Sequence, residues 1–199
     1  MNKNVVITVS RQYGCGGREL ATILAKKLNV NLYDKQIIHL AAAKLGIDDL
    51  SEEDLKELEN TVQPMTLTYV PFHSFGNHAG ESSRGMFIAE AGVIRKLAED
   101  GPCVILGRSA DYVLEDEPNH FSIFVCASDA YREQRGKDVY DGKTLKELNQ
   151  EDDKRARYYN YYTGKKWGDP VNYDLVVNTS NEPLDKIADA IIEYINTVK

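Results

Sequence analysis

The stretch VVITVSRQYGCGGRELATILAKKL, Val5 to Leu28, decides the fold, because a β-branched run passes through a glycine-rich turn directly into helical periodicity. Such a strand, loop and helix can cradle an anion. Glycines let the backbone curl so that several N–H groups converge, and the helix N-terminus adds partial positive charge. Two arginines bracket the glycines with side chains suited to phosphate contact. We therefore predict a phosphate-binding loop, and its residues are Ser10, Arg11, Tyr13, Gly14, Cys15, Gly16, Gly17, Arg18 and Glu19.

Two nucleotide-binding patterns compete for this loop. The triphosphate pattern GxxxxGK[ST], laid over Arg11 to Arg18, keeps only Gly16 and lacks both the lysine and the hydroxyl residue. The dinucleotide pattern GxGxxG keeps Gly14 but has Glu19 for its third glycine, while Asp34 occupies the place of a ribose-binding acid. An ordinary surface turn is the third alternative. A turn after the first strand of an α/β domain lies where ligands bind, so we favour phosphate binding.

The composition is that of a globular protein that handles a small ligand. The 199 residues are 42% apolar and 28% charged, which suits one main domain. With 31 acidic against 24 basic side chains, the net charge is −7, and a broad nucleic-acid surface is not expected. No stretch approaches the ~18 apolar residues of a membrane span. The start MNKNVVITV has no signal-like core, so we expect a cytoplasmic protein.

Strand and helix patterns alternate along the whole chain. This alternation predicts an α/β fold whose parallel sheet is covered by helices on both faces. A long irregular stretch, Thr61 to Gly85, interrupts it, and His73 and His78 there lack a third ligand, so no metal site is expected. The expected strands cover 31–33, 103–107, 121–127 and YDLVVNTS; the expected helices cover 19–28, 35–46, 86–98 and 183–198, and two more begin near Ser128 and Thr144.

Further arginines gather where the same ligand would lie. Arg108 leaves a buried strand in GRSAD and should reach the carboxyl edge of the sheet. Four more arginines lie on two consecutive helices, which could close over a phosphate as a lid, although solvated helix surface is the plainer explanation for any one of them. The tyrosines and tryptophan of YYNYYTGKKWGD are expected to pack this lid against the body. The lid arginines are Arg132, Arg135, Arg155 and Arg157.

Five segments together resemble the cytidylate kinase-like proteins of the P-loop nucleoside monophosphate kinase group. They are SRQYGCGGRELA, LYDKQII, VILGRSADYVL, DDKRARYYNYYTGKKWGD and YDLVVNTS. The resemblance implies a single kinase-like domain over residues 1–199, with a three-layer P-loop NTPase-type fold and about five parallel strands. It also implies an ATP phosphate loop, a monophosphate-binding insertion at 47–85 and an arginine-bearing lid at 129–170.

The resemblance also implies roles for particular residues. Arg108 corresponds to the arginine that meets the acceptor phosphate. True cytidylate kinases have a lysine where Gly17 stands and an aspartate where Ser109 stands. We hypothesise that Arg11 or Arg18 supplies the missing charge. The expected catalytic residues are Arg11, Arg18, Arg108, Arg132 and Arg155, and the expected substrate-binding residues are Asp34, Arg108, Asp111, Arg135 and Arg157.

These features together predict a phosphotransferase that moves the ATP γ-phosphoryl group to a small acceptor, with CMP or dCMP favoured and Mg²⁺ bridging the phosphates. Asp34 and Asp111 are candidates to orient the acceptor or a hydrated metal ion. One alternative is a nucleotide-binding regulatory module without turnover, since the lysine is lost. Another is an NAD-dependent oxidoreductase, since Gly14, Gly16 and Asp34 fit part of the dinucleotide pattern. No nucleic-acid or membrane partner is expected, and the oligomeric state is open.

Overall fold

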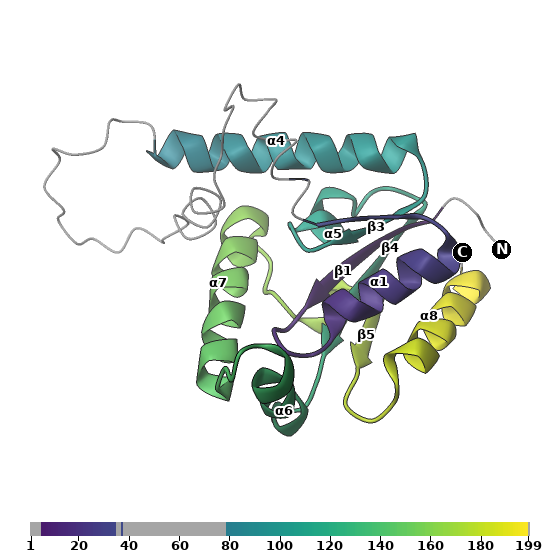
Figure 1. The fold of residues 1–199 in the computed structure, drawn as a ribbon. Coiled ribbons are helices and arrows are strands. Elements are labelled where there is room, and N and C mark those ends of the chain that lie inside the picture. Colours follow the sequence, from purple (N-terminus) through teal and green to yellow (C-terminus); the bar gives the residue numbers. More distant parts are fainter. Residues whose placement is uncertain (1–4, 35–36, 38–78, 199) are drawn as a thin grey trace, which may run out of the picture.

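The protein is built around a parallel β-sheet, as Figure 1 shows. The computed structural model describes residues 5–34, 37 and 79–198. Within this part of the chain, five strands lie in the order β2-β3-β1-β4-β5, and every pair is parallel. The predicted three-layer P-loop fold is therefore confirmed. The strands are β1 (Val6–Arg11), β2 (Asn31–Tyr33), β3 (Cys103–Leu106), β4 (His120–Cys126) and β5 (Leu175–Asn178).

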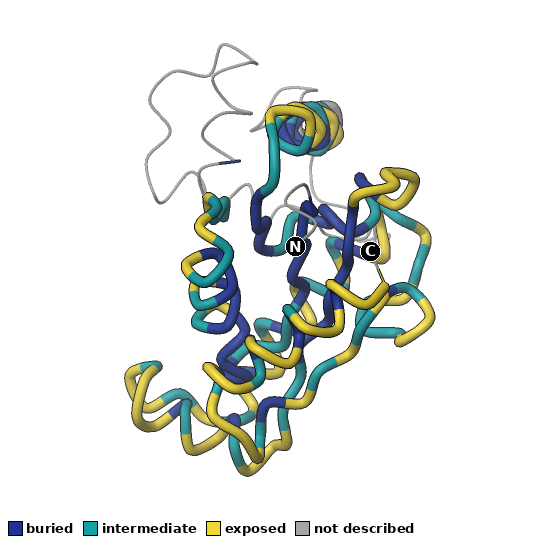
Figure 2. The backbone as a smooth tube through the Cα atoms, turned by 90° about the vertical axis from the view of Figure 1, so that its right-hand side faces the viewer, coloured by how far each residue is buried: buried dark blue, intermediate teal, exposed yellow. Residues whose placement is uncertain are grey.

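Helices cover both faces of the sheet because residues of β1 point alternately to either side. Ile7 and Val9 pack with α1 and α8, whereas Val6 packs with α4 and α5. Figure 2 shows that the buried residues, in dark blue, gather in the interior of the fold. The helices are α1 (Gly17–Leu28), α4 (Ala79–Asp100), α5 (Ala110–Val113), α6 (Asp129–Val139), α7 (Leu145–Thr163) and α8 (Leu184–Val198), with a 3₁₀ turn η1 (Pro170–Asn172).

Two helices begin earlier than the sequence pattern indicated. α1 begins at Gly17 rather than Glu19, and α4 begins at Ala79 rather than Met86. Both additional segments are polar or glycine-containing, so hydrophobic periodicity gave no signal there. Of the insertion expected at 47–85, residues 47–78 lie outside the described residues, as do His73 and His78 and most of the helix expected at 35–46.

The expected lid region forms two helices, α6 and α7. Ser128 caps α6, and Thr144 and Glu147 form the predicted capping box of α7. The aromatic cluster packs α7 against α4: the rings of Phe87 and Tyr162 stack with centroids 4.4 Å apart. Tyr158 and Tyr162 thus pack α7 against α4 as predicted, whereas Tyr161 is 64% exposed. None of the helices in the described part of the chain combines the length and apolar character that crossing a membrane requires.

Candidate functional site

A cavity of about 490 Å³ lies at the carboxyl ends of β1, β2 and β3. Parallel strands end at the same edge of a sheet, so side chains that follow different strands meet there. α7 contributes the remaining wall, with Arg155 and Tyr158 among its lining residues. The sequence-predicted residues that line the cavity are Ser10, Arg11, Tyr13, Gly14, Gly16, Gly17, Arg18, Asp34, Arg108 and Arg155.

The glycine loop curls as an anion cradle requires. Gly14 and Gly16 have φ values of +81° and +80°, which other residues rarely adopt. The amide of Leu20 already bonds to the Gly16 carbonyl, as in a continuing helix. No described residue accepts a hydrogen bond from the amides of Gly14, Gly16, Arg18 or Glu19. Unpaired amides at a helix N-terminus are suited to hold phosphate oxygens.

The side chain of Arg11 leaves no room for a side chain at Gly17. A Cβ atom at Gly17 would lie 2.5 Å from Arg11 Cβ, closer than real Cβ contacts. A Cβ atom at Gly107 would likewise collide with Arg11 Nη1. Gly17 therefore has to lack a side chain, whereas at Gly107 the contact is with the flexible end of Arg11, which enters the same cavity as the loop.

Positive charge is concentrated around Arg11. Burial, together with the neighbouring Arg155, Arg108 and Arg18, lowers the pKa of Arg11 to about 9, while Asp34 opposes the shift. Asp34 also forms an ion pair with Arg18. Four guanidinium groups around one cavity, with this carboxylate near them, favour a multiply charged anion. Phosphate, unlike a single carboxylate, brings enough negative charge to balance such a cluster.

Backbone strain and a buried carboxylate hold Arg108 at the cavity. Gly107, Arg108 and Ser109 have consecutive positive φ values of +76°, +61° and +49°. Such conformations are unfavourable for residues with side chains and concentrate at functional sites. Arg108 Nη1 lies 3.5 Å from Glu90 Oε1, and Glu90 accepts a 2.7 Å hydrogen bond from Tyr158. The strained turn thus directs Arg108 into a network that joins α4 to α7.

The sequence analysis missed Glu90, although a signal for it was present. Glu90 lies on the helix face that Phe87, Ala91 and Ile94 define, where a carboxylate interrupts the apolar pattern. A charged residue on an apolar face is rarely buried unless it is paired. The structure has it 2% exposed and next to Arg108.

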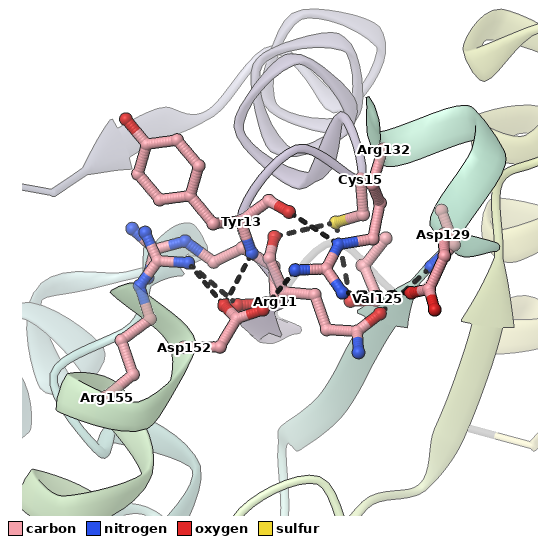
Figure 3. Close-up of polar contacts among 10 residues, drawn as sticks. Arg11, Tyr13, Cys15, Val125, Asp129, Arg132, Asp152 and Arg155 are labelled. Atoms are coloured by element: carbon pink, nitrogen blue, oxygen red, sulfur yellow. Dashed lines mark hydrogen bonds and ion pairs between the residues drawn. The ribbon is translucent and has the colours of Figure 1, made fainter. Parts of the chain in front are cut away.

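Arg132 and Asp152 clamp the backbone of the loop at Tyr13, as Figure 3 shows. The Tyr13 amide donates to Asp152 Oδ1 at 2.6 Å, and Arg132 Nε donates to the Tyr13 carbonyl at 2.8 Å. Arg132 Nη2 and Asp152 Oδ2 close the ring at 2.6 Å. Arg132 is 2% exposed and is not among the described residues that line the cavity. Its contact with the loop is the hydrogen bond to the Tyr13 carbonyl. We call this arrangement the loop clamp.

Arg155 connects the loop clamp to the cavity. Its Nη1 donates to the Arg11 carbonyl at 3.1 Å and lies 3.4 Å from Asp152 Oδ1. Its guanidinium carbon lies 5.0 Å from the centroid of the Tyr13 ring, within the range of a cation–π contact. Burial raises the pKa of Asp152 to about 6, against the hydrogen bond from Tyr13 and the charge of Arg132.

The thiol of Cys15 has a raised pKa, although its place in the loop would favour a lowered one. A thiol among arginines at a helix N-terminus is a candidate for a lowered pKa. Instead Cys15 is fully buried, its Sγ donates to the Gln12 carbonyl at 3.1 Å, and burial raises its pKa to about 11. The side chain fills space beneath the loop.

The other predicted site residues lie apart from the cavity lining. Glu19 pairs with Arg135 on α6, so both link the loop to the lid region. Asp111 is buried and accepts a 3.2 Å hydrogen bond from Ser10. Arg157 is exposed on α7 and is not among the described residues that line the cavity. Within the described residues, no group of three or more His, Cys, Asp or Glu is placed to hold a metal ion.

The sheet order, the glycine cradle and the arginine-lined cavity define a P-loop fold of the kinase type. The chain belongs to the cytidylate kinase-like family, which it matches over residues 6–181. No curated protein matches it significantly in sequence.

Solved structures show the same fold. An uncharacterized protein from Eubacterium ventriosum ATCC 27560 is 27% identical, with a TM-score of 0.71 over 98% of this chain and 99% of that one. A shikimate kinase from Bacteroides thetaiotaomicron is 14% identical, with a TM-score of 0.56 over 96% and 98%. A gluconokinase from Sinorhizobium meliloti 1021 is 14% identical, with a TM-score of 0.55 over 100% and 95%.

Proposed function

We propose that the protein transfers the γ-phosphoryl group of ATP to a small phosphorylated acceptor, a nucleoside monophosphate of the CMP or dCMP type. The observation that carries the proposal is the cluster of Arg11, Arg18, Arg108 and Arg155 around a cradle of unpaired amides. Phosphoryl transfer depends mainly on positioning and on neutralising charge on the phosphates, and this cavity supplies both. Family membership and the kinase fold support the same reaction class.

Arg11 takes the part that a loop lysine has in related proteins. Its side chain enters the cavity between Gly17 and Gly107, beside the cradle. Burial and the neighbouring guanidinium groups lower its pKa to about 9, and phosphate oxygens among these groups would oppose that shift. Arg11 therefore stabilises negative charge that increases on the transferring group, which is an effect on rate more than on binding.

The two nucleotides would occupy opposite ends of the cavity. The glycine cradle and Arg155 hold the donor phosphates, with the Tyr13 ring beside Arg155. Arg108 and Asp34 follow other strands and face the acceptor. Ser109 lines the cavity where true cytidylate kinases have an aspartate, so this chain lacks one acidic contact to the acceptor.

The residues present fit ATP better than they fit a protein-held metal ion. Asp34 and Glu151 are the carboxylates among the described lining residues, and Asp34 is paired with Arg18. Mg²⁺ in such sites is bound by one or two carboxylates and by substrate phosphates. When bound, it neutralises charge between the phosphates. Here it would enter with the nucleotide, and Asp34 and Glu151 are the side chains able to orient its shell.

Turnover of the purified protein with ATP, Mg²⁺ and a panel of nucleoside monophosphates tests the proposal. We expect CMP or dCMP to be phosphorylated, and Arg11→Ala to lower kcat by about a hundredfold or more with little change in ATP affinity. Arg95→Ala is the matched control, because Arg95 is exposed on α4 and does not line the cavity. Equal rates for Arg11→Ala and the unchanged chain would remove Arg11 from the reaction.

A second candidate function is a nucleotide-binding module without turnover. The observation that favours it is Gly17, since the space next to it is closed to a lysine. Tight ATP binding with no product from any monophosphate would select this alternative over the kinase.

A further inference from the structure

Glu90 is a buried carboxylate next to the acceptor end of the cavity. The residue is 2% exposed and comes from the middle of α4. It is not among the described residues that line the cavity, so it can act on a ligand only through the side chains that it holds. The reaction proposed above gives Glu90 no part.

The two oxygens of Glu90 hold two side chains that do line the cavity. Oε1 lies 3.5 Å from Arg108 Nη1, and Oε2 accepts a hydrogen bond of 2.7 Å from the Tyr158 hydroxyl. Arg108 follows β3, whereas Tyr158 lies on α7. One carboxylate on α4 therefore holds side chains from two other parts of the fold.

Burial strengthens both contacts. The side chains of Glu90 and Arg108 are 3% and 15% exposed, so water screens their attraction only weakly. Burial, followed by the charge of Glu90, raises the pKa of Tyr158 well above its usual value. Tyr158 therefore keeps its proton and donates it to Glu90.

An arginine that receives a phosphate binds best when its guanidinium is already oriented. The side chain is long and flexible, and holding it in place before the ligand arrives lowers the entropy lost on binding. The turn at Arg108 and Ser109, both with positive φ, fixes where this side chain starts. Glu90 fixes where the guanidinium ends.

We propose that Glu90 is a positioning residue for the acceptor, which orients the Arg108 guanidinium toward the acceptor phosphate while Tyr158 holds the carboxylate in place. The inference rests on the proposed function, since that function assigns Arg108 to the acceptor. Glu90 itself touches neither nucleotide. Its effect should therefore appear in acceptor binding and disappear when Arg108 is absent.

Calorimetric binding of CMP to the full chain, saturated with a non-hydrolysable ATP analogue, tests the proposal. Glu90→Gln removes the charge and keeps the shape, so we expect CMP affinity to fall about tenfold, while affinity for the analogue stays within about twofold. Glu99→Gln, at an exposed position of the same helix, should change neither affinity. An equal loss for both ligands would indicate a general structural role and overturn the proposal.

Tyr158→Phe is the second variant, which stays informative if Glu90→Gln does not fold. It removes the hydroxyl that donates to Glu90 and leaves the ring. We expect CMP affinity to fall about twofold to fivefold. Tyr161→Phe is its control, because Tyr161 is 64% exposed, and should leave CMP affinity unchanged. Equal CMP affinity in Tyr158→Phe and the unchanged chain would count against the assignment.

A double variant shows whether Glu90 acts through Arg108. In an Arg108→Gln background, Glu90→Gln should cost no further CMP affinity, because the side chain that it positions is gone. Additive losses would refute the assignment. An unchanged chain that binds no CMP would refute the proposed function and this inference with it, whereas CMP binding that does not depend on Glu90 refutes this inference alone.

Discussion

The side chain of Arg11 limits the size of the residue that position 17 can hold. Arg11 Cβ occupies the place that a side chain at position 17 would take, and the rest of Arg11 passes Gly107 into the cavity. The positive charge near the cradle therefore comes from Arg11 at the end of β1, and not from a lysine at position 17. The exchange keeps a cation near the phosphates but moves its origin to a rigid strand in the middle of the sheet.

This dependence predicts that a lysine at position 17 will damage the protein. In Gly17→Lys, the new Cβ would lie 2.5 Å from Arg11 Cβ, so the strand or the loop must shift. Overpacking of this kind typically costs about 1–3 kcal/mol. We expect a lower melting temperature and weaker ATP binding, measured by thermal unfolding with and without nucleotide.

The double variant Arg11→Ala, Gly17→Lys gives the matched comparison. Truncating Arg11 beyond Cβ relieves only part of the crowding, so the double variant should be more stable than the sum of the two single changes predicts. Gly92→Ala serves as the control for adding a side chain, since nothing lies within 4 Å of its Cβ position. Additive losses in the double variant would show that the two positions are not coupled.

At the scale of elements, α6 and α7 are fixed to the loop through the loop clamp. Arg132 comes from α6 and Asp152 from α7, and both bind backbone groups of the same residue, Tyr13. The two helices and the glycine loop are therefore joined through one buried ion pair. Breaking such a pair on one side leaves an uncompensated charge, which is strongly destabilising.

The loop clamp predicts a particular pH dependence of stability. Burial raises the pKa of Asp152 from 3.8 to about 6, so between these values the native protein binds a proton that the unfolded chain has released. The free energy of unfolding should therefore fall as the pH rises from about 4 to about 6, by on the order of 2 kcal/mol from this group. Urea unfolding across that range measures the slope.

Asp152→Asn cannot titrate and should lose this part of the slope, whatever its absolute stability. Glu193→Gln is the control, because Glu193 is exposed on α8 and is not among the charged groups that act on Asp152, so the slope should stay unchanged. The same slope in the unchanged chain and in Asp152→Asn would contradict the role assigned to Asp152.

Sequence patterns predicted elements better than they predicted contacts between them. Alternating strands and helices gave the parallel sheet, because apolar periodicity depends on local burial. The roles of Arg132 and Asp152 depend on how α6 and α7 pack beside the loop, which no local pattern encodes. Arg132 was expected at a phosphate, whereas the structure places it on the Tyr13 carbonyl. Arg11, Arg18, Arg108 and Arg155 were predictable because strand ends and the lid region face one cavity.

At the scale of the whole molecule, the order of strands separates the function hypotheses. β1 lies between β3 and β4, whereas in the dinucleotide-binding fold the second strand lies next to the first. The partial GxGxxG match at Gly14 and Gly16 therefore follows the first strand of a sheet whose strand order differs from that of the dinucleotide-binding fold. The net charge of −7 is distributed so that a positive cavity remains inside an acidic protein, which concentrates small anions at one place.

Stability in the presence of ligands tests this conclusion on the intact chain. A ligand that binds only the native state at a hundred times its Kd adds about 2.7 kcal/mol, or several degrees of melting temperature for a chain of this size. We expect ATP to give such a shift, measured by calorimetry at matched ionic strength, and NADH to give none. ATP protection should also weaken as salt screens the arginine cluster. Protection by NADH but not by ATP would show that strand order and cavity charge do not determine what this protein binds.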